Sequence, residues 1–169
     1  LLVGILPASE GEIVIAGIPM TKGRLDEIRR KVGFVFQDPD DQLFMARVYD
    51  DIAFGPRNFG HSAEESQAMA DKAMEIMGID HLKNRAPHKL SGGEKRNVAI
   101  AAVLAMEPDV LLLDEPSSYL DPKSRRNFIH AMEGLHHTKL IATHDLDLVM
   151  DICDRVIILK KGEVFADGK

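Results

Sequence analysis

The sequence has 169 residues, of which 45% are hydrophobic, and this is enough apolar material for one sizeable core. Its net charge of -6 argues against the basic surface that nucleic-acid-binding proteins usually present. The single cysteine, Cys153, excludes an internal disulfide and suits a reducing compartment. No apolar run approaches the ~20 residues that cross a bilayer, so we expect any membrane contact to be made through a partner protein.

The first part of the chain predicts strands separated by polar segments. Residues 7–11 indicate a turn, and residues 12–17 alternate enough to form a strand in an antiparallel layer. Residues 21–30 are polar with a few apolar positions, which is typical of a short helix or a loop. Residues 31–37 are then predicted to form a buried strand that ends in the polar side chain of Gln37.

Residues 39–106 change to helical patterning. Ser62 and Glu65 have the S-x-x-E spacing of a capping box, which starts a helix, and Gly78 is expected to end that helix. Residues 48–54 mix acidic and apolar residues in the pattern of an amphipathic core segment. This stretch therefore predicts a helical insertion between two strands.

Ser91 and Glu94 form a second capping box ahead of a helix, and such a box stabilises a helix by roughly 1 kcal/mol. Capping does not require Gly92 and Gly93 between them, where they lower helix propensity. Glycines let a phosphate approach the backbone closely, and a helix N-terminus offers N–H donors and a partial positive charge to an anion. The segment therefore predicts a helix start that can also bind an anion.

Residues 110–113 are four branched apolar residues that run directly into Asp114 and Glu115. This pattern is typical of a strand buried on both faces of a parallel sheet, and Pro116 is expected to stop it because proline has no N–H. In open α/β sheets, ligands bind at the carboxyl ends of the strands. An acid pair taken alone is more simply a solvated strand end, but its neighbours in the sequence favour a role in chemistry.

The last third of the chain returns to alternating helices and strands. The pattern predicts helices over 122–135 and 146–153, strands over 139–143, 155–159 and 164–166, and a hairpin turn over 160–163. The strand over 139–143 ends at His144. Three strands thus deliver Gln37, the acid pair and His144 to one rim of one sheet. A lone histidine is more often structural than catalytic, but three convergent strand ends indicate a site.

In their order and spacing, these segments resemble the motifs of ABC transporter ATP-binding subunits. Residues 37–44 further resemble the ATPases of cobalt or nickel and energy-coupling-factor importers. The sequence departs from the family pattern in having Glu94 where glutamine is usual, Asn97 where a basic residue is frequent, and the bulky Tyr119 in place of a small residue. Gln37 matches the Q-loop, residues 90–94 the LSGGQ signature, residues 110–115 Walker B, residues 117–121 the D-loop, and His144 the switch histidine.

The resemblance implies an α/β fold of the P-loop NTPase (RecA-like) type, with a parallel sheet core, an inserted helical subdomain and remnants of an antiparallel β layer. It implies one ABC-type ATP-binding domain over residues 1–169, with an α/β core at 1–38 and 107–169 and a helical subdomain at 39–106 that carries the signature. The P-loop pattern G-x-x-x-x-G-K-[ST] does not occur. Because residues 1–6 resemble the last turns of the helix that follows that loop, we expect the chain to lack its N-terminal part.

The resemblance also implies ATP and Mg2+ as ligands. Asp114 would belong to the Mg2+ shell through water, and Gln37 would touch the metal or the attacking water. Glu115 would be the general base, and His144 would hydrogen-bond the γ-phosphate. A nucleotide held mainly by a second ATP-binding subunit would contact Ser91, Gly92, Gly93 and Glu94, and Asp121 would cross the interface between the two subunits.

These roles predict an ATP hydrolase that drives an ABC importer, of cobalt, nickel or a vitamin, through an integral membrane subunit at the cytoplasmic face of the cell membrane. By the same resemblance, residues 48–54 would either belong to the core or dock the membrane subunit. Without the P-loop, this chain itself is expected to bind ATP weakly and not to hydrolyse it. The alternatives are a non-transport ABC ATPase that acts on nucleic acid or ribosomes, and a non-catalytic scaffold.

Overall fold

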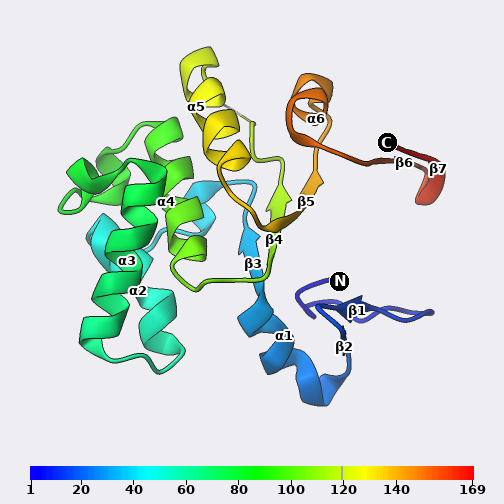
Figure 1. Cartoon of the computed structure of the whole chain (residues 1–169), viewed down its shortest axis with the longest axis horizontal. Coiled ribbons are helices and arrows are strands. Elements are labelled where there is room, and N and C mark those ends of the chain that lie inside the picture. The colour runs from blue at the N-terminus through cyan, green and yellow to red at the C-terminus, as the bar shows by residue number, and fades with distance from the viewer. Residues whose placement is uncertain (119) are drawn as a thin grey trace.

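The structure is a computed structural model that describes residues 1–118 and 120–169, so the bulky residue at position 119 lies outside the described residues. Its centre is a three-stranded parallel sheet in the order β3 (Val32–Val35), β4 (Val110–Asp114) and β5 (Thr138–Ala142) (Figure 1). Val35 pairs with Leu113 in the first ladder. The second ladder ends where Asp114 pairs with Ala142, so the three strands finish at one edge of the sheet.

The central strand β4 is the buried strand that the apolar run predicts. Leu111, Leu112 and Leu113 are all buried, as expected for a strand that is covered on both faces. The strand ends two residues before Pro116, because Glu115 leaves the extended conformation and takes a φ of 42°. A non-glycine residue in this left-handed region is uncommon and is most often found at turns and functional sites.

Helices fill the chain between β3 and β4, as predicted. They are α2 (Val48–Asn58), α3 (Ala63–Met77) and α4 (Gly92–Leu104), which pack against one another on one side of the sheet (Figure 1). The expected start of α3 is confirmed: Glu65 N donates to Ser62 Oγ at 3.2 Å, and Ser62 N donates to Glu65 Oε2 at 2.8 Å. Gly78 ends α3 with a φ of 64°. Short 3-10 turns lie before and between these helices: η2 (Pro39–Asp41), η3 (Asp80–Leu82) and η4 (Pro87–Lys89).

The N-terminal segment differs from the prediction in two places. Residues 1–6 form turns instead of the end of a helix, with the N–H of Gly4 donating to the Leu1 carbonyl at 2.8 Å. Gly4 takes a φ of 73°, which lies outside the right-handed helical range and interrupts helical geometry there. The strand expected over 12–17 is shorter, because Ala16 and Gly17 take φ values of 49° and 76° and reverse the chain. The result is a hairpin of β1 (Val14–Ile15) and β2 (Ile18–Pro19), followed by η1 (Lys22–Arg24) and α1 (Leu25–Lys31).

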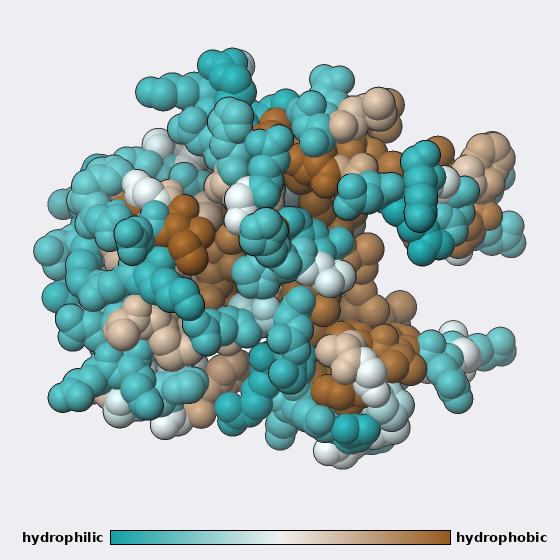
Figure 2. Space-filling view, viewed as in Figure 1, coloured by the Kyte–Doolittle hydropathy of each residue, from teal (hydrophilic) through white to brown (hydrophobic). Residues whose placement is uncertain are grey.

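The C-terminal elements agree with the prediction to within about two residues at each end. They are α5 (Pro122–Glu133), α6 (Leu146–Ile152), β6 (Val156–Lys160) and β7 (Glu163–Gly168). β6 and β7 form an antiparallel ribbon that extends away from the sheet (Figure 1). Figure 2 shows apolar surface in the opening between this ribbon and the β1–β2 hairpin. Among the described residues, none of the helices combines the length and the apolarity that crossing a membrane requires.

One buried cluster joins the helical insertion to the sheet. It includes Ile52 of α2, Met74 of α3 and Ile100 of α4, which pack with Leu111 of β4 and Phe128 of α5. Because α4 lies between the other helices and β3, its start is fixed relative to the carboxyl edge of the sheet. A second, smaller cluster under the β1–β2 hairpin consists of Ile15, Ile18, Ile28, Val32 and Leu112.

Candidate functional site

The acid pair and the histidine meet at the carboxyl edge of the sheet, as the sequence predicts. Asp114 is the last residue of β4, and the N–H of Glu115 donates to the carbonyl of Ala142 in β5 at 2.8 Å. This pairing brings the residues after both strands together. Nδ1 of His144 lies 2.8 Å from Oε1 of Glu115.

The carboxylate of Glu115 is held on several sides. Its second oxygen, Oε2, accepts from Thr143 Oγ1 at 3.2 Å and from Ser118 Oγ at 3.5 Å. The side chain of Glu115 is 20% exposed, whereas that of His144 is 84% exposed. The carboxylate of Glu115 raises the pKa of His144 above its ordinary value. The site therefore contains an oriented carboxylate beside an accessible imidazole.

Asp145 connects this pair to α5 and to the segment after β4. It receives two hydrogen bonds from the Arg125 guanidinium, both at 3.1 Å, and one from Ser117 Oγ at 2.9 Å. It also caps α6 by accepting from the N–H of Leu148. Led by the Arg125 contact, these interactions lower the pKa of Asp145 to about 2. Neither Asp145 nor Arg125 is among the site residues predicted from the sequence, although an aspartate directly before an apolar helical run is a capping signal.

Gln37 lies two residues beyond β3 and is exposed. Its backbone is fixed by a residue that is not among the predicted site residues. The guanidinium of Arg96, on α4, donates to the carbonyls of Phe36 and Gln37, each at 2.6 Å. Gln42 adds a second connection, because its Nε2 donates to the carbonyl of Ala99 in α4 at 2.7 Å.

The predicted anion-binding segment is the N-terminus of α4, and its capping box is present. Glu94 N donates to Ser91 Oγ at 3.3 Å, and Ser91 N donates to Glu94 Oε2 at 2.7 Å. This bond to the Ser91 N–H lowers the pKa of Glu94, and Arg85 Nη1 lies 3.4 Å from Glu94 Oε1. The carboxylate that replaces the usual glutamine thus turns back toward its own helix start and toward a cation.

The two glycines of this segment have different surroundings. A Cβ at Gly93 would lie 2.4 Å from Oγ and 2.7 Å from Cβ of Ser124, so the close packing of α4 against α5 requires glycine there. A Cβ at Gly92 would meet nothing within 4 Å. Gly92 therefore leaves the start of α4 open to a ligand. The sequence predicts this role for both glycines, but Gly93 is required for packing. Asp121 caps α5, accepting from the N–H groups of Lys123 and Ser124 at 2.9 and 3.1 Å.

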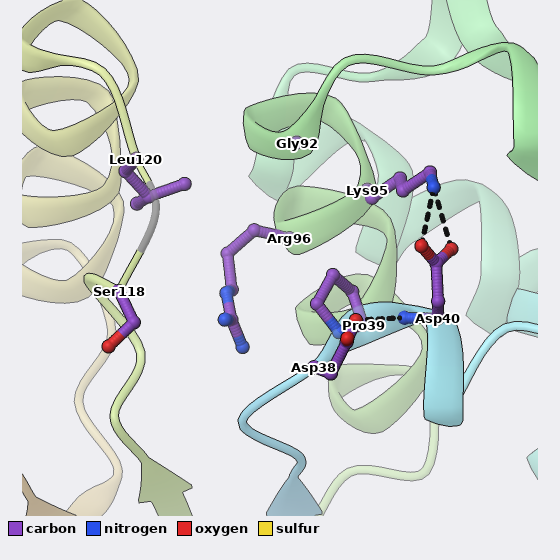
Figure 3. A pocket seen from close by; sticks show the side chains of 8 residues that line it. All are labelled: Asp38, Pro39, Asp40, Gly92, Lys95, Arg96, Ser118 and Leu120. Carbon is purple, nitrogen blue, oxygen red and sulfur yellow. Dashed lines mark hydrogen bonds and ion pairs between the residues drawn. The ribbon is translucent and has the colours of Figure 1, made fainter.

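A pocket of about 230 Å³ separates the start of α4 from the segments after β3 and β4 (Figure 3). Lys95 Nζ closes one side by contacting both oxygens of Asp40 at 2.6 and 2.7 Å. In the close-up, the Arg96 side chain extends between the segment that carries Ser118 and the residues after β3 (Figure 3). The pocket is lined by Asp38, Pro39, Asp40, Gly92, Lys95, Arg96, Ser118 and Leu120.

The donor set fits Mg2+ that arrives with a nucleotide. Within residues 1–118 and 120–169, no three His, Cys, Asp or Glu side chains are arranged to hold a metal by themselves. Asp114, Glu115 and Gln37 supply oxygen donors near one sheet edge. Mg2+ prefers such hard oxygen ligands and usually keeps several waters and phosphate oxygens in its shell.

Two curated relatives illustrate the similarity of this chain to known proteins. A putative ABC transporter ATP-binding protein of Geobacter sulfurreducens is 51% identical over 165 residues, which are 98% of this chain and 66% of that protein. An energy-coupling factor transporter ATP-binding protein of Methanospirillum hungatei is 43% identical over 170 residues, which are 98% of this chain and 43% of that protein. The chain spans just under two thirds of the length of the curated relatives that it matches at about half identity.

Solved structures and a family model agree with these relatives. The structure of cbiO1 from Clostridium perfringens, part of the ABC transporter complex cbiONQ, has a TM-score of 0.90 and 42% identity, and covers 99% of this chain and 69% of that one. The dimeric ATP-binding cassette MJ0796, bound to ADP and Pi, has a TM-score of 0.81 and 30% identity over 95% of this chain and 74% of that one. Both confirm the expected P-loop NTPase fold. The family model described as ABC transporter matches residues 1–118, and the chain therefore belongs to the ABC transporter family.

Proposed function

We propose that this chain forms the larger part of an ABC-type ATP-binding subunit, and that the subunit hydrolyses ATP to drive an importer. The observation that carries the proposal is the Glu115 carboxylate, held by His144, Thr143 and Ser118 at the carboxyl edge of a parallel sheet. Ligands bind at this edge in open α/β folds. The hydrolytic activity is proposed for a subunit that has this chain together with a phosphate-binding loop.

Glu115 is proposed as the general base for the attacking water. Its three neighbours fix the direction of the carboxylate, and this orientation reduces the entropy lost when the water is positioned. His144 has an exposed imidazole that can donate to a phosphate oxygen while Glu115 keeps its ring oriented. Asp114 and Gln37 would hold Mg2+, which when bound neutralises charge on the phosphates.

The start of α4 is proposed to contact the nucleotide of a second ATP-binding subunit. Ser91 and the open backbone at Gly92 offer N–H donors at a helix N-terminus, where an anion is stabilised. Glu94 is turned back on Ser91 and lies close to Arg85, which limits its repulsion of a phosphate. Support for a dimer comes from the similar cassette MJ0796, which is dimeric with ADP and Pi. Asp121 would lie at the interface between the two subunits.

A membrane subunit is the second proposed partner. Residues 48–54, predicted either to belong to the core or to dock the membrane subunit, have a buried and an exposed face on α2. Val48, Ile52 and Ala53 are buried, whereas Phe54 is 41% exposed. Phe54 stacks edge-to-face on Phe44, which is 65% exposed, with ring centroids 5.0 Å apart. An exposed aromatic pair of this kind is typical of an interface anchor. This contact would place the subunit at the cytoplasmic face of the cell membrane.

The proposed cargo of the importer is a cobalt or nickel ion or a vitamin. The resemblance of residues 37–44 to cobalt, nickel and energy-coupling-factor ATPases supports cobalt, nickel or a vitamin as cargo, as do relatives with energy-coupling-factor names.

We assign residues 39–106 to a helical subdomain and residues 1–38 and 107–169 to an α/β core. The run of helices between β3 and β4 supports this division.

The test is the substitution Glu115→Gln in the subunit that includes the phosphate-binding loop. Removing the base should lower the ATP turnover rate by about 10²–10⁴-fold, while ATP binding and ATP-dependent dimerisation remain. Glu133→Gln is the matched control, because Glu133 also contacts a histidine, with its Oε2 3.2 Å from Nδ1 of His130, but lies on the surface of α5. Near-normal turnover in the Glu115→Gln subunit would remove Glu115 from the base role.

A further inference from the structure

Arg96 connects two segments that the proposed function places on the nucleotide. It lies in the second turn of α4, the helix that begins at the signature residues, and it is only 1% exposed. Its Nη1 and Nη2 atoms donate to the carbonyls of Phe36 and Gln37, both at 2.6 Å. The Arg96 side chain therefore extends from α4 to the backbone of Gln37, the residue predicted to contact Mg2+ or the attacking water.

Packing alone does not explain why an arginine occupies this buried position. Burying a guanidinium is costly, and here both partners are neutral carbonyls instead of a carboxylate. Within the described part of the chain, the buried Nε of Arg96 has no hydrogen-bond partner. An apolar side chain of similar length would fill the same space without that cost. The guanidinium, in contrast, fixes two successive carbonyls through its forked geometry.

Neighbouring contacts tie the same segment to α4 at other points. The Gln42 side chain donates to the Ala99 carbonyl and accepts from the N–H of Phe36 at 3.3 Å. Lys95 contacts Asp40, three residues beyond Gln37 (Figure 3). Arg96 differs from Gln42 and Lys95 because it donates directly to the carbonyl of Gln37.

We propose that Arg96 is a positioning residue, which holds the backbone of Gln37 so that its carboxamide and the start of α4 keep a fixed separation. The proposal rests on the proposed function, since Gln37 needs accurate placement only if it contacts Mg2+ or the attacking water. A displacement of about 1 Å at such a group can lower a rate by about 10²-fold.

The first test uses Arg96→Met in the subunit that includes the phosphate-binding loop. We expect kcat for ATP to fall by about 10- to 100-fold, with KM for ATP within about twofold of the unmodified subunit, because the buried Arg96 guanidinium is directed at the carbonyls of Phe36 and Gln37. The double variant Arg96→Met with Gln37→Ala should be no slower than Gln37→Ala alone, since both changes remove one function. Multiplying effects in the double variant would overturn the proposal.

Two further variants separate positioning from stability. Arg96→Lys keeps a cation that can reach one carbonyl but lacks the fork, so it should lose part of kcat and show the same dependence on Gln37. It carries the test if Arg96→Met does not fold. Lys72→Met is the control, because it removes an exposed ion pair with Glu107, a few residues beyond the other end of α4 and outside the pocket. Its turnover should stay near that of the unmodified subunit, and an equal loss in both variants would overturn the proposal.

Hydrogen exchange gives a readout that does not depend on hydrolysis. In Arg96→Met, the amides of residues 36–38 should exchange faster than in the unmodified subunit without nucleotide, because the carbonyls lose their clamp. Unchanged exchange there would overturn the proposal even if turnover falls. If the unmodified subunit does not hydrolyse ATP, the proposed function fails, and the exchange rates still decide whether Arg96 holds this segment.

Discussion

Protonation of His144, which contacts Glu115, should change with pH in a predictable direction. The Glu115 carboxylate, 2.8 Å away, raises the pKa of His144 above its ordinary value of 6.5. Because the folded-state pKa is the higher one, this contact contributes its full stability below about pH 6.5. The contribution is lost as the pH rises through the folded-state pKa.

An NMR titration of the His144 imidazole nitrogens tests this relation. Glu115→Gln removes the negative charge and should return the pKa of His144 toward its ordinary value. Glu133→Gln, which alters a different carboxylate beside a histidine, should leave the titration of His144 unchanged. If the pKa of His144 did not fall in the Glu115→Gln protein, the contact between the two side chains would be absent in solution.

Arg125 and Asp145 predict an acid-sensitive contribution to stability. The pKa of Asp145 is lowered from 3.8 to about 2, first by the Arg125 hydrogen bonds, so the contact stabilises the fold above about pH 4 and is lost as the pH falls through about 2. Arg125→Met should therefore lower the free energy of unfolding by up to about 2 kcal/mol at pH 7 and by much less at pH 2. Urea unfolding at both pH values measures this. Arg126→Met, next along α5 and exposed, should show no such pH dependence.

At the scale of elements, the two capping boxes allow a matched comparison. Ser62 starts α3 and Ser91 starts α4 with the same reciprocal contacts to a glutamate three residues on. Ser62→Ala and Ser91→Ala should each lower the free energy of unfolding by about 1 kcal/mol. Only Ser91→Ala should also weaken ATP-dependent dimerisation, measured by size-exclusion chromatography of the Glu115→Gln subunit. Equal dimerisation in both variants would show that α4 has no nucleotide role at its start.

Strand β3 depends on a glycine for its contact with α4. A Cβ at Gly33 would lie 2.2 Å from Cγ1 of Val103, a buried side chain that has one favoured rotamer in a helix. Gly33→Ala should therefore lower the free energy of unfolding by about 1–3 kcal/mol, measured by denaturant titration. Gly23→Ala is the control, because nothing lies within 4 Å of a Cβ at that position. A loss in the control as large as that in Gly33→Ala would contradict this account.

The elements that could be predicted from the sequence are those with a local signal. Four apolar residues predict β4, and the S-x-x-E pairs predict the starts of α3 and α4, because strand burial and capping involve near neighbours. The contacts of Arg96 and Arg125 leave no such signal, since their partners lie about 60 and 20 residues away. The expected helix at residues 1–6 was wrong because a family resemblance, and not a local hydrogen-bonding pattern, predicted it.

At the scale of the whole molecule, the site depends on how α4 is attached to the sheet. The parallel register of β4 and β5 brings Glu115 and His144 together. The predicted anion site at Ser91 has its position because Gly93 packs on Ser124 and Arg96 reaches the end of β3. The sequence order of the motifs therefore predicts the fold, whereas the placement of the helical insertion depends on long-range packing that no single motif contains.

The exposed pair Phe44 and Phe54 gives the whole-molecule prediction of membrane coupling. Phe44 follows the Gln37 segment, and Asp51 holds it by accepting from the N–H groups of Phe44 and Met45, both at 3.0 Å. A partner that presses on this pair would therefore act on a segment that is tied to α4 and to Gln37. Phe44→Ser should leave ATP turnover of the isolated subunit within about twofold, because the side chain is far more exposed than buried.

Association with the membrane subunit should respond differently. Loss of a central aromatic anchor typically costs about 2 kcal/mol or more, so Phe44→Ser should weaken co-purification of the two subunits by at least about tenfold. Ile76→Ser is the control. Ile76 lies on α3 and is 48% exposed, so this substitution removes apolar surface outside the aromatic pair. If both variants retained the membrane subunit equally, the Phe44–Phe54 pair would not be its docking site. If both lost it equally, docking would depend on general surface hydrophobicity and not on this pair.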